Sequence, residues 1–193
     1  MNGNGIIRSR AYLLDRPNID TDQIIPARFL TTTTRQGLGA HAFSEWRFDA
    51  QGRPRADCPL NDPGLAGAGI IVAGNNFGCG SSREHAAWAL RDLGIRAVVS
   101  TQVADIFKSN ALRNGIAPVV VGEAAHTWLR AHAEAEIVID LRTRRIGCEG
   151  RSFGFEIDPF GRRCLIEGID DFGWLMNHER QIHAYEERVG WTH

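Results

Sequence analysis

The sequence predicts an α/β fold in which a partly parallel sheet is flanked by helices and followed by short antiparallel strands. Between residues 69 and 133, short apolar runs alternate with helix-forming segments, which is the order of parallel strands joined by crossover helices. After residue 135, strand-like runs follow one another directly. The 193 residues show no internal repeat, so we expect one domain over residues 1–193.

The first third of the chain predicts one strand followed by irregular structure. Residues 6–14 predict a strand, and residues 18–22 form a polar turn rich in Asx side chains. Residues 23–30 predict a short strand or turn around a proline. The aromatic run 40–48 should pack. We expect the loop from residue 31 to about residue 67 to be poorly fixed without a partner, because this segment is polar, Gly-rich and has little to bury.

The middle of the chain carries the strand–helix alternation. Its expected strands are 69–73, 97–99 and 117–121, and its expected helices are 83–93, 103–113 and 123–133. The C-terminal part predicts strands at 136–140, 144–148 and 152–157, then helices at 160–175 and 178–189 with a break at 168–171.

Composition and charge exclude several classes of protein. The formal net charge is −1, which gives no global basic field for nucleic acid or an anionic membrane. No run approaches the roughly 18 apolar residues that a membrane span needs, and the first ten residues do not resemble a signal peptide. The four cysteines, Cys58, Cys79, Cys148 and Cys164, lack zinc or ferredoxin spacing. We therefore expect a cytoplasmic protein with no nucleic-acid or membrane partner.

The segment from residue 75 to residue 85 has the features of an anion site. It follows a predicted buried strand and opens a predicted helix, and Gly78 and Gly80 allow close approach of the backbone. Ser81 or Ser82 could cap the helix, whose first N–H groups and positive dipole end attract anions. Arg83 adds a guanidinium that can bind a carboxylate or phosphate in bidentate fashion.

Each of these features alone has an ordinary structural explanation. A serine pair before a helix is commonly a cap, and Gly-x-Gly is commonly a turn. Only their coincidence favours a small-anion site, and a non-catalytic anion-binding module fits the same turn. Cys79 within the turn is interpreted as a small neutral filler rather than a nucleophile, because no base with an orienting partner is evident beyond His85.

The turn also resembles a family signature. Gly78-Cys79-Gly80-Ser81-Ser82-Arg83-Glu84 is similar to the Gly-x-Gly-Ser-Ser-Arg-Glu signature of the swivelling β/β/α domain of the aconitase superfamily. Further blocks, in family order, resemble the small subunits of isopropylmalate isomerases within that superfamily. They are Asn18–Ala27, Thr34–Phe43, Trp46–Phe48, Ala104–Phe107 with Asn110, Glu167–Asp171 and Ile182–Glu186.

The resemblance implies a hydro-lyase that is active only with a large subunit, which would carry the [4Fe–4S] cluster and its three cysteine ligands, so that this chain binds no cofactor or metal. In that family the serine that maps to Ser81 is the catalytic base, and Ser82 and Arg83 bind a small dicarboxylate substrate. A loop arginine adds to substrate binding. Arg35 is our choice, ahead of Arg28 and then Arg47.

The remaining candidate residues are expected to support the site or to line the interface with the large subunit. They are Asp20, Thr21, Asp22, Glu84 and His85. For at least one aspartate we favour turn stabilisation. His41, His85 and His178 have no metal-site spacing. The expected reaction interconverts 2- and 3-isopropylmalate in leucine biosynthesis. The alternative substrates are citraconate or methylmalate, dimethylmaleate and homoaconitate. Thr31–Thr34 and Leu38 favour the apolar substrate.

Overall fold

The computed structural model describes residues 5–190, and its strands form one eight-stranded sheet of order β1-β6-β7-β8-β5-β4-β3-β2. The strands are β1 (Ile6–Ser9), β2 (Ala11–Leu14), β3 (Ile70–Ala73), β4 (Ala97–Ser100), β5 (Ala117–Val121), β6 (Ile137–Asp140), β7 (Arg145–Cys148) and β8 (Arg151–Glu156). The predicted α/β class is confirmed, and so are the strands predicted after residue 68, within one residue at each end.

Longer helices alternate with the central strands, and short helical turns fill the segment before them. The α-helices are α1 (Thr21–Ile24), α2 (Ser44–Arg47), α3 (Glu84–Asp92), α4 (Asp105–Arg113), α5 (Glu123–Ala131), α6 (Pro159–Glu167), α7 (Asp171–Asn177) and α8 (Glu179–Val189). The 3₁₀ turns are η1 (Ala27–Phe29), η2 (Leu38–His41), η3 (Pro59–Asn61) and η4 (Pro63–Leu65). None of the helices between residues 5 and 190 is both long and apolar enough to cross a bilayer.

The sheet has a parallel half and an antiparallel half. Strands β2, β3, β4 and β5 pair in parallel, and β3 and β4 are buried at every position. Such continuous burial is typical of parallel strands that are covered on both faces. Strands β5, β8, β7, β6 and β1 pair antiparallel. Glu149 and Gly150 join β7 to β8 with positive φ at both residues, as a tight hairpin requires.

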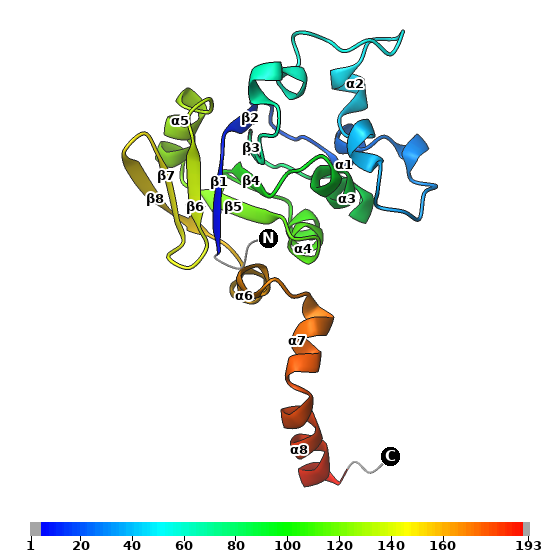
Figure 1. Cartoon of the computed structure of the whole chain (residues 1–193), viewed down its shortest axis with the longest axis vertical. Helices are drawn as coiled ribbons and strands as arrows, with labels where there is room; N and C mark the ends of the chain where they lie inside the picture. The colour runs from blue at the N-terminus through cyan, green and yellow to red at the C-terminus, as the bar shows by residue number, and fades with distance from the viewer. Residues whose placement is uncertain (1–4, 191–193) are drawn as a thin grey trace.

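The single strand predicted over residues 6–14 is wrong, because the structure divides this run at Arg10. β1 pairs with β6 at one edge of the strand order, whereas β2 pairs with β3 at the other edge. Only Arg10 separates the two strands, so the sheet must curl until its two edges meet there. Figure 1 shows this segment passing between the two halves of the sheet.

Two apolar cores lie on the two faces of the parallel strands. One core packs β-strand side chains such as Ile71 and Val98 against α3 and α4, through Leu90 and Phe107. The other packs the opposite faces of the same strands against α5 and the antiparallel half. In Figure 1, α3 and α4 lie on one side of the parallel strands, and α5 lies with β6–β8 on the other.

The segment between β2 and β3 is better anchored than its composition predicted. Residues 23–30 form the end of α1 and the turn η1 instead of a strand. Leu38, Phe43 and Leu60 are buried in the first core, and the argument that residues 31–67 have little to bury is therefore wrong. Residues 31–37 are the exception, since none of them is buried.

The predicted C-terminal helices are confirmed, with a break between α6 and α7. α6 ends at Gly168, whose φ of 71° gives the left-handed C-cap, and Asp170 caps α7 through a hydrogen bond from the Gly173 N–H. α7 and α8 extend away from the rest of the fold (Figure 1). No residue of α8 is buried, so this helix packs little apolar surface within the described chain.

Candidate active site

The turn singled out in the sequence lies where β3 ends and α3 begins. Two buried polar side chains fix the end of β3. His126 Nε2 lies 2.7 Å from the carbonyl oxygen of Ala73, and the Ser100 hydroxyl donates a 2.8 Å hydrogen bond to the carbonyl oxygen of Gly74. Buried polar groups with satisfied hydrogen bonds hold a backbone in one place. The turn therefore leaves the sheet from a fixed point.

The turn next packs on α4, and the close approach requires a glycine. Phe77 is fully buried and meets Phe107 edge-on, with ring centroids 5.2 Å apart. Gly78 has a φ of 75°, and a Cβ added there would lie 2.3 Å from Phe107 Cγ. No other residue can adopt this backbone and also avoid the ring.

The segment that begins α1 lies directly against the turn. The Gly78 N–H donates to the carbonyl oxygen of Ile19 at 2.7 Å, and the Thr21 N–H donates to that of Cys79 at 2.9 Å. The Thr21 hydroxyl donates to the carbonyl oxygen of Ser81, also at 2.9 Å. The two motifs that the sequence singled out, some 60 residues apart, therefore form one hydrogen-bonded unit.

Ser81 and Ser82 do not cap α3, contrary to one prediction. The N-cap residue is Arg83, with extended backbone, and no side chain caps the helix. Both serines are exposed, and Ser81 precedes the first helical residue by three positions and Ser82 by two. Because their hydroxyl groups do not cap the helix, the first turn keeps N–H groups and the positive end of the dipole for an external anion.

Asp20 and Asp22 have different places beside this turn. The Asp20 carboxylate accepts the Gln23 N–H at 2.7 Å, and the Gln23 side chain accepts the Asp20 N–H at 3.0 Å, which is a capping box for α1. Asp22 instead forms an ion pair with Arg83. A guanidinium has five N–H donors in a fixed plane, so one carboxylate does not exhaust its capacity.

The four cysteines lie apart from one another in the described part of the chain, and none is part of a disulfide. Burial, and secondarily the charge of Asp20, raises the pKa of the Cys79 thiol, so the thiol stays protonated. Cys58, Cys148 and Cys164 are free and buried. Within residues 5–190, no three His, Cys, Asp or Glu side chains are grouped to hold a metal ion. The residues present therefore do not fit an iron–sulfur cluster.

The three candidate loop arginines have different surroundings. Arg28 forms a 2.5 Å ion pair with Glu45, and Arg47 donates to the carbonyl oxygens of Gly39 and Ala42 at 3.2 and 3.3 Å. Arg35 lies over the ring of Trp88 on α3 and is exposed. No ion pair within the described part of the chain involves Arg35, which leaves its guanidinium available to an anion.

Glu84 and His85 make contacts that the sequence did not reveal. Asn114 Nδ2 donates to Glu84 Oε1 at 3.1 Å, which ties the start of α3 to the end of α4. His85 Nε2 lies 3.0 Å from the carbonyl oxygen of Thr32. Neither Trp88 nor Asn114 was singled out from the sequence as a site residue, and Thr32 was considered only as part of Thr31–Thr34 for substrate choice. Only Trp88 could have indicated the loop contact from the sequence, because an aromatic residue one turn after the start of this helix is well placed to pack against a loop.

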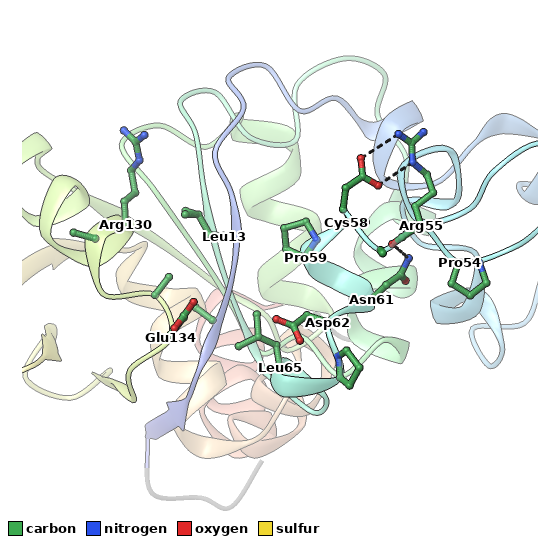
Figure 2. Close-up of a pocket in the computed structure, with 16 residues that line it drawn as sticks. Leu13, Pro54, Arg55, Cys58, Pro59, Asn61, Asp62, Leu65, Arg130 and Glu134 are labelled. Carbon is green, nitrogen blue, oxygen red and sulfur yellow. Dashed lines mark hydrogen bonds and ion pairs between the residues drawn. The ribbon is translucent and has the colours of Figure 1, made fainter.

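A cavity of about 830 Å³ lies elsewhere, between the η3–η4 region and the end of α5. Figure 2 shows Leu13, Pro59 and Leu65 among the apolar groups around it, with Arg130 and Glu134 at the left of the view. Some of its charged groups pair with each other, as Arg55 does with Asp57. The lining includes no residue of the turn at 78–83, so this cavity is not the candidate site.

The sequence matches a known protein family and is similar to individual members of it. Residues 9–124 match the family described as the aconitase C-terminal domain. A protein of Anaeromyxobacter dehalogenans named 3-isopropylmalate dehydratase small subunit is 50% identical over 182 residues, which cover 94% of this chain and 95% of the relative. The protein of the same name from Chloroflexus aurantiacus is 49% identical over 185 residues, 93% of this chain and 92% of the relative.

A solved structure agrees with this placement. The crystal structure of 3-isopropylmalate dehydratase from Methanocaldococcus jannaschii superposes with a TM-score of 0.69 at 28% identity. The match covers 94% of this chain and 99% of that one. The likeness therefore extends over nearly the whole chain.

Proposed function

Because the chain belongs to the family of 3-isopropylmalate dehydratase small subunits, we propose that it supplies one half of the active site of a hydro-lyase that interconverts 2- and 3-isopropylmalate in leucine biosynthesis. One observation carries the proposal at the level of residues. Ser81 and Ser82 are exposed beside Arg83 at the uncapped start of α3, on a turn held in place by Thr21. We assign these hydroxyl groups, the guanidinium and the helix start to one anion site.

Ser81 is the proposed base. A serine hydroxyl is a poor base unless its alkoxide is stabilised, and the start of the nine-residue helix α3 and the Arg83 guanidinium both stabilise negative charge there. The alkoxide takes the proton from the carbon next to a carboxylate. The electrons of that C–H bond form the C=C bond, and hydroxide leaves from the neighbouring carbon. In the second half of the reaction, the proton returns to the carbon that lost hydroxide, and hydroxide adds to the carbon that lost the proton, which completes the isomerisation.

The substrate has two carboxylates, and the chain offers separate cations for them. Arg83 and Ser82 lie beside the proposed base and are assigned to the carboxylate whose α-carbon loses the proton. Arg35 lies on the loop over α3 and is assigned to the other carboxylate. Developing negative charge on the first carboxylate strengthens its bonds to Arg83 in the transition state. Arg28 and Arg47 are already held by protein oxygens.

The departure of hydroxide needs a Lewis acid that this chain does not provide. Its free cysteines are dispersed, and no described group of side chains fits a cluster. We therefore assign a [4Fe–4S] cluster to the large subunit and expect the small subunit alone to be inactive. Reduced thiols and a cluster-bearing partner suit the cytoplasm, where we place the complex.

The side chains that select the substrate differ in part from those expected. Leu38 is buried in the first core and cannot line a pocket for the isopropyl group. Thr31–Thr34 lie in the loop before Arg35 and remain available for it. An additional carboxylate, as in homoaconitate, would call for an additional cation. The relatives at about 50% identity are named for the isopropylmalate reaction, which favours this substrate over the alternatives.

Reconstitution tests the proposal. The chain is mixed with a cluster-loaded large subunit and 3-isopropylmalate, and the unsaturated intermediate is followed by its ultraviolet absorbance. We expect turnover only when both chains are present. Turnover with citraconate but not with isopropylmalate would change the assigned substrate and leave the assigned mechanism unchanged. A formed complex with an intact cluster and no turnover on any of these acids would favour a non-catalytic anion-binding module.

A further inference from the structure

Helix α3 presents three side chains in one stripe to the loop before it. His85, Trp88 and Asp92 are spaced i, i+3 and i+7, which places them on one face of a helix. His85 and Trp88 contact the loop 31–37, which carries Arg35, and Asp92 contacts Gly39 in η2 directly after that loop. The helix that starts at the candidate active site is therefore also the surface on which the loop lies.

The contact nearest to the site is a hydrogen bond from His85. Its Nε2 lies 3.0 Å from the carbonyl oxygen of Thr32. A carbonyl oxygen only accepts, so Nε2 carries the hydrogen and donates. The imidazole also packs against the Trp88 ring, with centroids 4.6 Å apart. The ring is thereby oriented toward the loop by its neighbour one turn along the helix.

Two further contacts continue along the stripe. The Arg35 guanidinium carbon lies 5.1 Å from the centroid of the Trp88 ring, within the range of a cation–π interaction. The Gly39 N–H donates to Asp92 Oδ2 at 2.8 Å. A Cβ at Gly39 would lie 2.5 Å from the Leu93 nitrogen, so the backbone of η2, directly after the loop, touches the end of α3. Loop and helix therefore run side by side in fixed register.

The loop has little else to hold it. None of residues 31–37 is buried, and the hydrogen bonds of Thr32 with Thr34 are local. A segment without buried apolar surface opens at low cost in free energy. Its conformation therefore depends on the few contacts with α3, of which the His85 bond lies closest to the start of the helix.

We propose that His85 is a positioning residue that keeps the loop 31–37, and with it Arg35, in register with Ser81. The proposal rests on the function assigned above, in which Arg35 binds a substrate carboxylate. One rigid helix carries the catalytic turn at its start and the loop contacts along its side, so it sets the distance between the proposed base and the second carboxylate binder. His85 itself acts through Thr32 and not on the substrate.

Two substitutions separate the hydrogen bond from the ring. His85→Phe keeps a planar ring against Trp88 and removes the donor, whereas His85→Gln keeps an N–H at a similar reach. In the reconstituted complex we expect His85→Phe to raise the KM for 3-isopropylmalate by roughly 5- to 10-fold, the worth of one hydrogen bond, with kcat within about twofold. His85→Gln should restore a KM close to that of the unsubstituted chain. Arg91→Gln, at an exposed position of the same helix, is the matched control.

A second readout does not depend on activity. Trypsin can cut the full-length free chain after Arg35, in the exposed loop, and the rate of this cut reports how often the loop opens. We expect His85→Phe to speed cleavage after Arg35 by roughly 5- to 10-fold, because the loop loses one hydrogen bond that holds it closed. Cleavage after Arg28, which is paired with Glu45, serves as an internal reference in each digest. Circular dichroism and the Tm confirm that each variant is folded.

The two readouts distinguish failure of this proposal from failure of the assigned function. Faster cleavage after Arg35 together with a raised KM supports the positioning role. Unchanged cleavage in folded His85→Phe overturns it, and so does faster cleavage with an unchanged KM. If the unsubstituted complex shows no turnover, the assigned function fails. If that complex is active but His85→Phe leaves the cleavage rate of the free chain unaltered, only the role of His85 is overturned.

Discussion

The Thr21 hydroxyl donates a 2.9 Å hydrogen bond to the carbonyl oxygen of Ser81. Thr21 is almost fully buried, whereas Ser81 is exposed, so a rigid residue of α1 fixes the backbone of a residue that faces the solvent. The Thr21 N–H also donates to the neighbouring Cys79 carbonyl. Placement of the proposed base therefore depends on a segment far away in the sequence.

Thr21→Val should test this dependence, because valine has the shape of threonine without the donor. We expect a loss of about 1 kcal/mol in the free energy of unfolding. Turnover in the reconstituted complex should fall by roughly tenfold or more, since a small misplacement of a reacting group is costly. Thr127→Val, at an exposed position of α5, is the control. Equal turnover in both variants would contradict a positioning role for Thr21.

Ser81→Ala removes the proposed base and little else, because the side chain is exposed. We expect kcat to fall by roughly 10²- to 10⁴-fold, the usual contribution of a positioned base, with a stability change within about 0.5 kcal/mol. Ser82→Ala should mainly raise KM. Titration calorimetry with the large subunit should show unchanged assembly for both variants. Substantial turnover by the Ser81→Ala complex would refute the assignment of the base.

The sequence predicted the elements that local patterns determine. The alternation from β3 to α5 and the hairpin strands β6–β8 follow from short-range periodicity, which a single chain displays. The division at Arg10 was missed because apolar residues lie on both sides of it, at 6–7 and at 11–14, and were assigned to one strand. What breaks the run is the tertiary requirement that β1 and β2 pair with opposite edges of the sheet.

The composition of the candidate turn was predictable, but its partners were not. Gly78, Ser81 and Arg83 lie where the motif placed them, whereas the cap expected from a serine is absent because the backbone becomes helical only after Arg83. The contacts of Thr21 with Ser81 and of His85 with Thr32 span more than 50 residues, and no local pattern encodes them. Packing of the aromatic run 40–48 was expected and Phe43 is buried, but the rest of residues 31–67 was underestimated because Leu38 and Leu60 are buried without any periodic spacing.

Gly78→Ala should be much more destabilising than an ordinary glycine substitution. The new Cβ would meet the Phe107 ring and the residue would keep a φ of 75°, so overpacking and backbone strain add. We expect a loss of roughly 3 kcal/mol or more in the free energy of unfolding. Gly150→Ala has a φ of 73° but nothing within 4 Å, and should cost only about 1 kcal/mol. Similar losses in urea unfolding of the two variants would show that Phe107 is not a constraint.

Alkaline pH should weaken the fold through buried thiols. Burial raises the pKa of Cys148 and of Cys164 above the ordinary value of 9.0, because the thiolate is poorly solvated in the fold. A raised folded-state pKa contributes stability that is fully present below 9.0 and is lost as the pH rises through the raised value. Tyr12, whose pKa burial raises from 10.0, adds a further loss at higher pH. Urea unfolding at a series of pH values should show this decline in the free energy of unfolding, and Cys148→Ala should make the decline shallower. A free energy of unfolding that stays constant above pH 9.0 would mean that burial does not raise the pKa of these thiols.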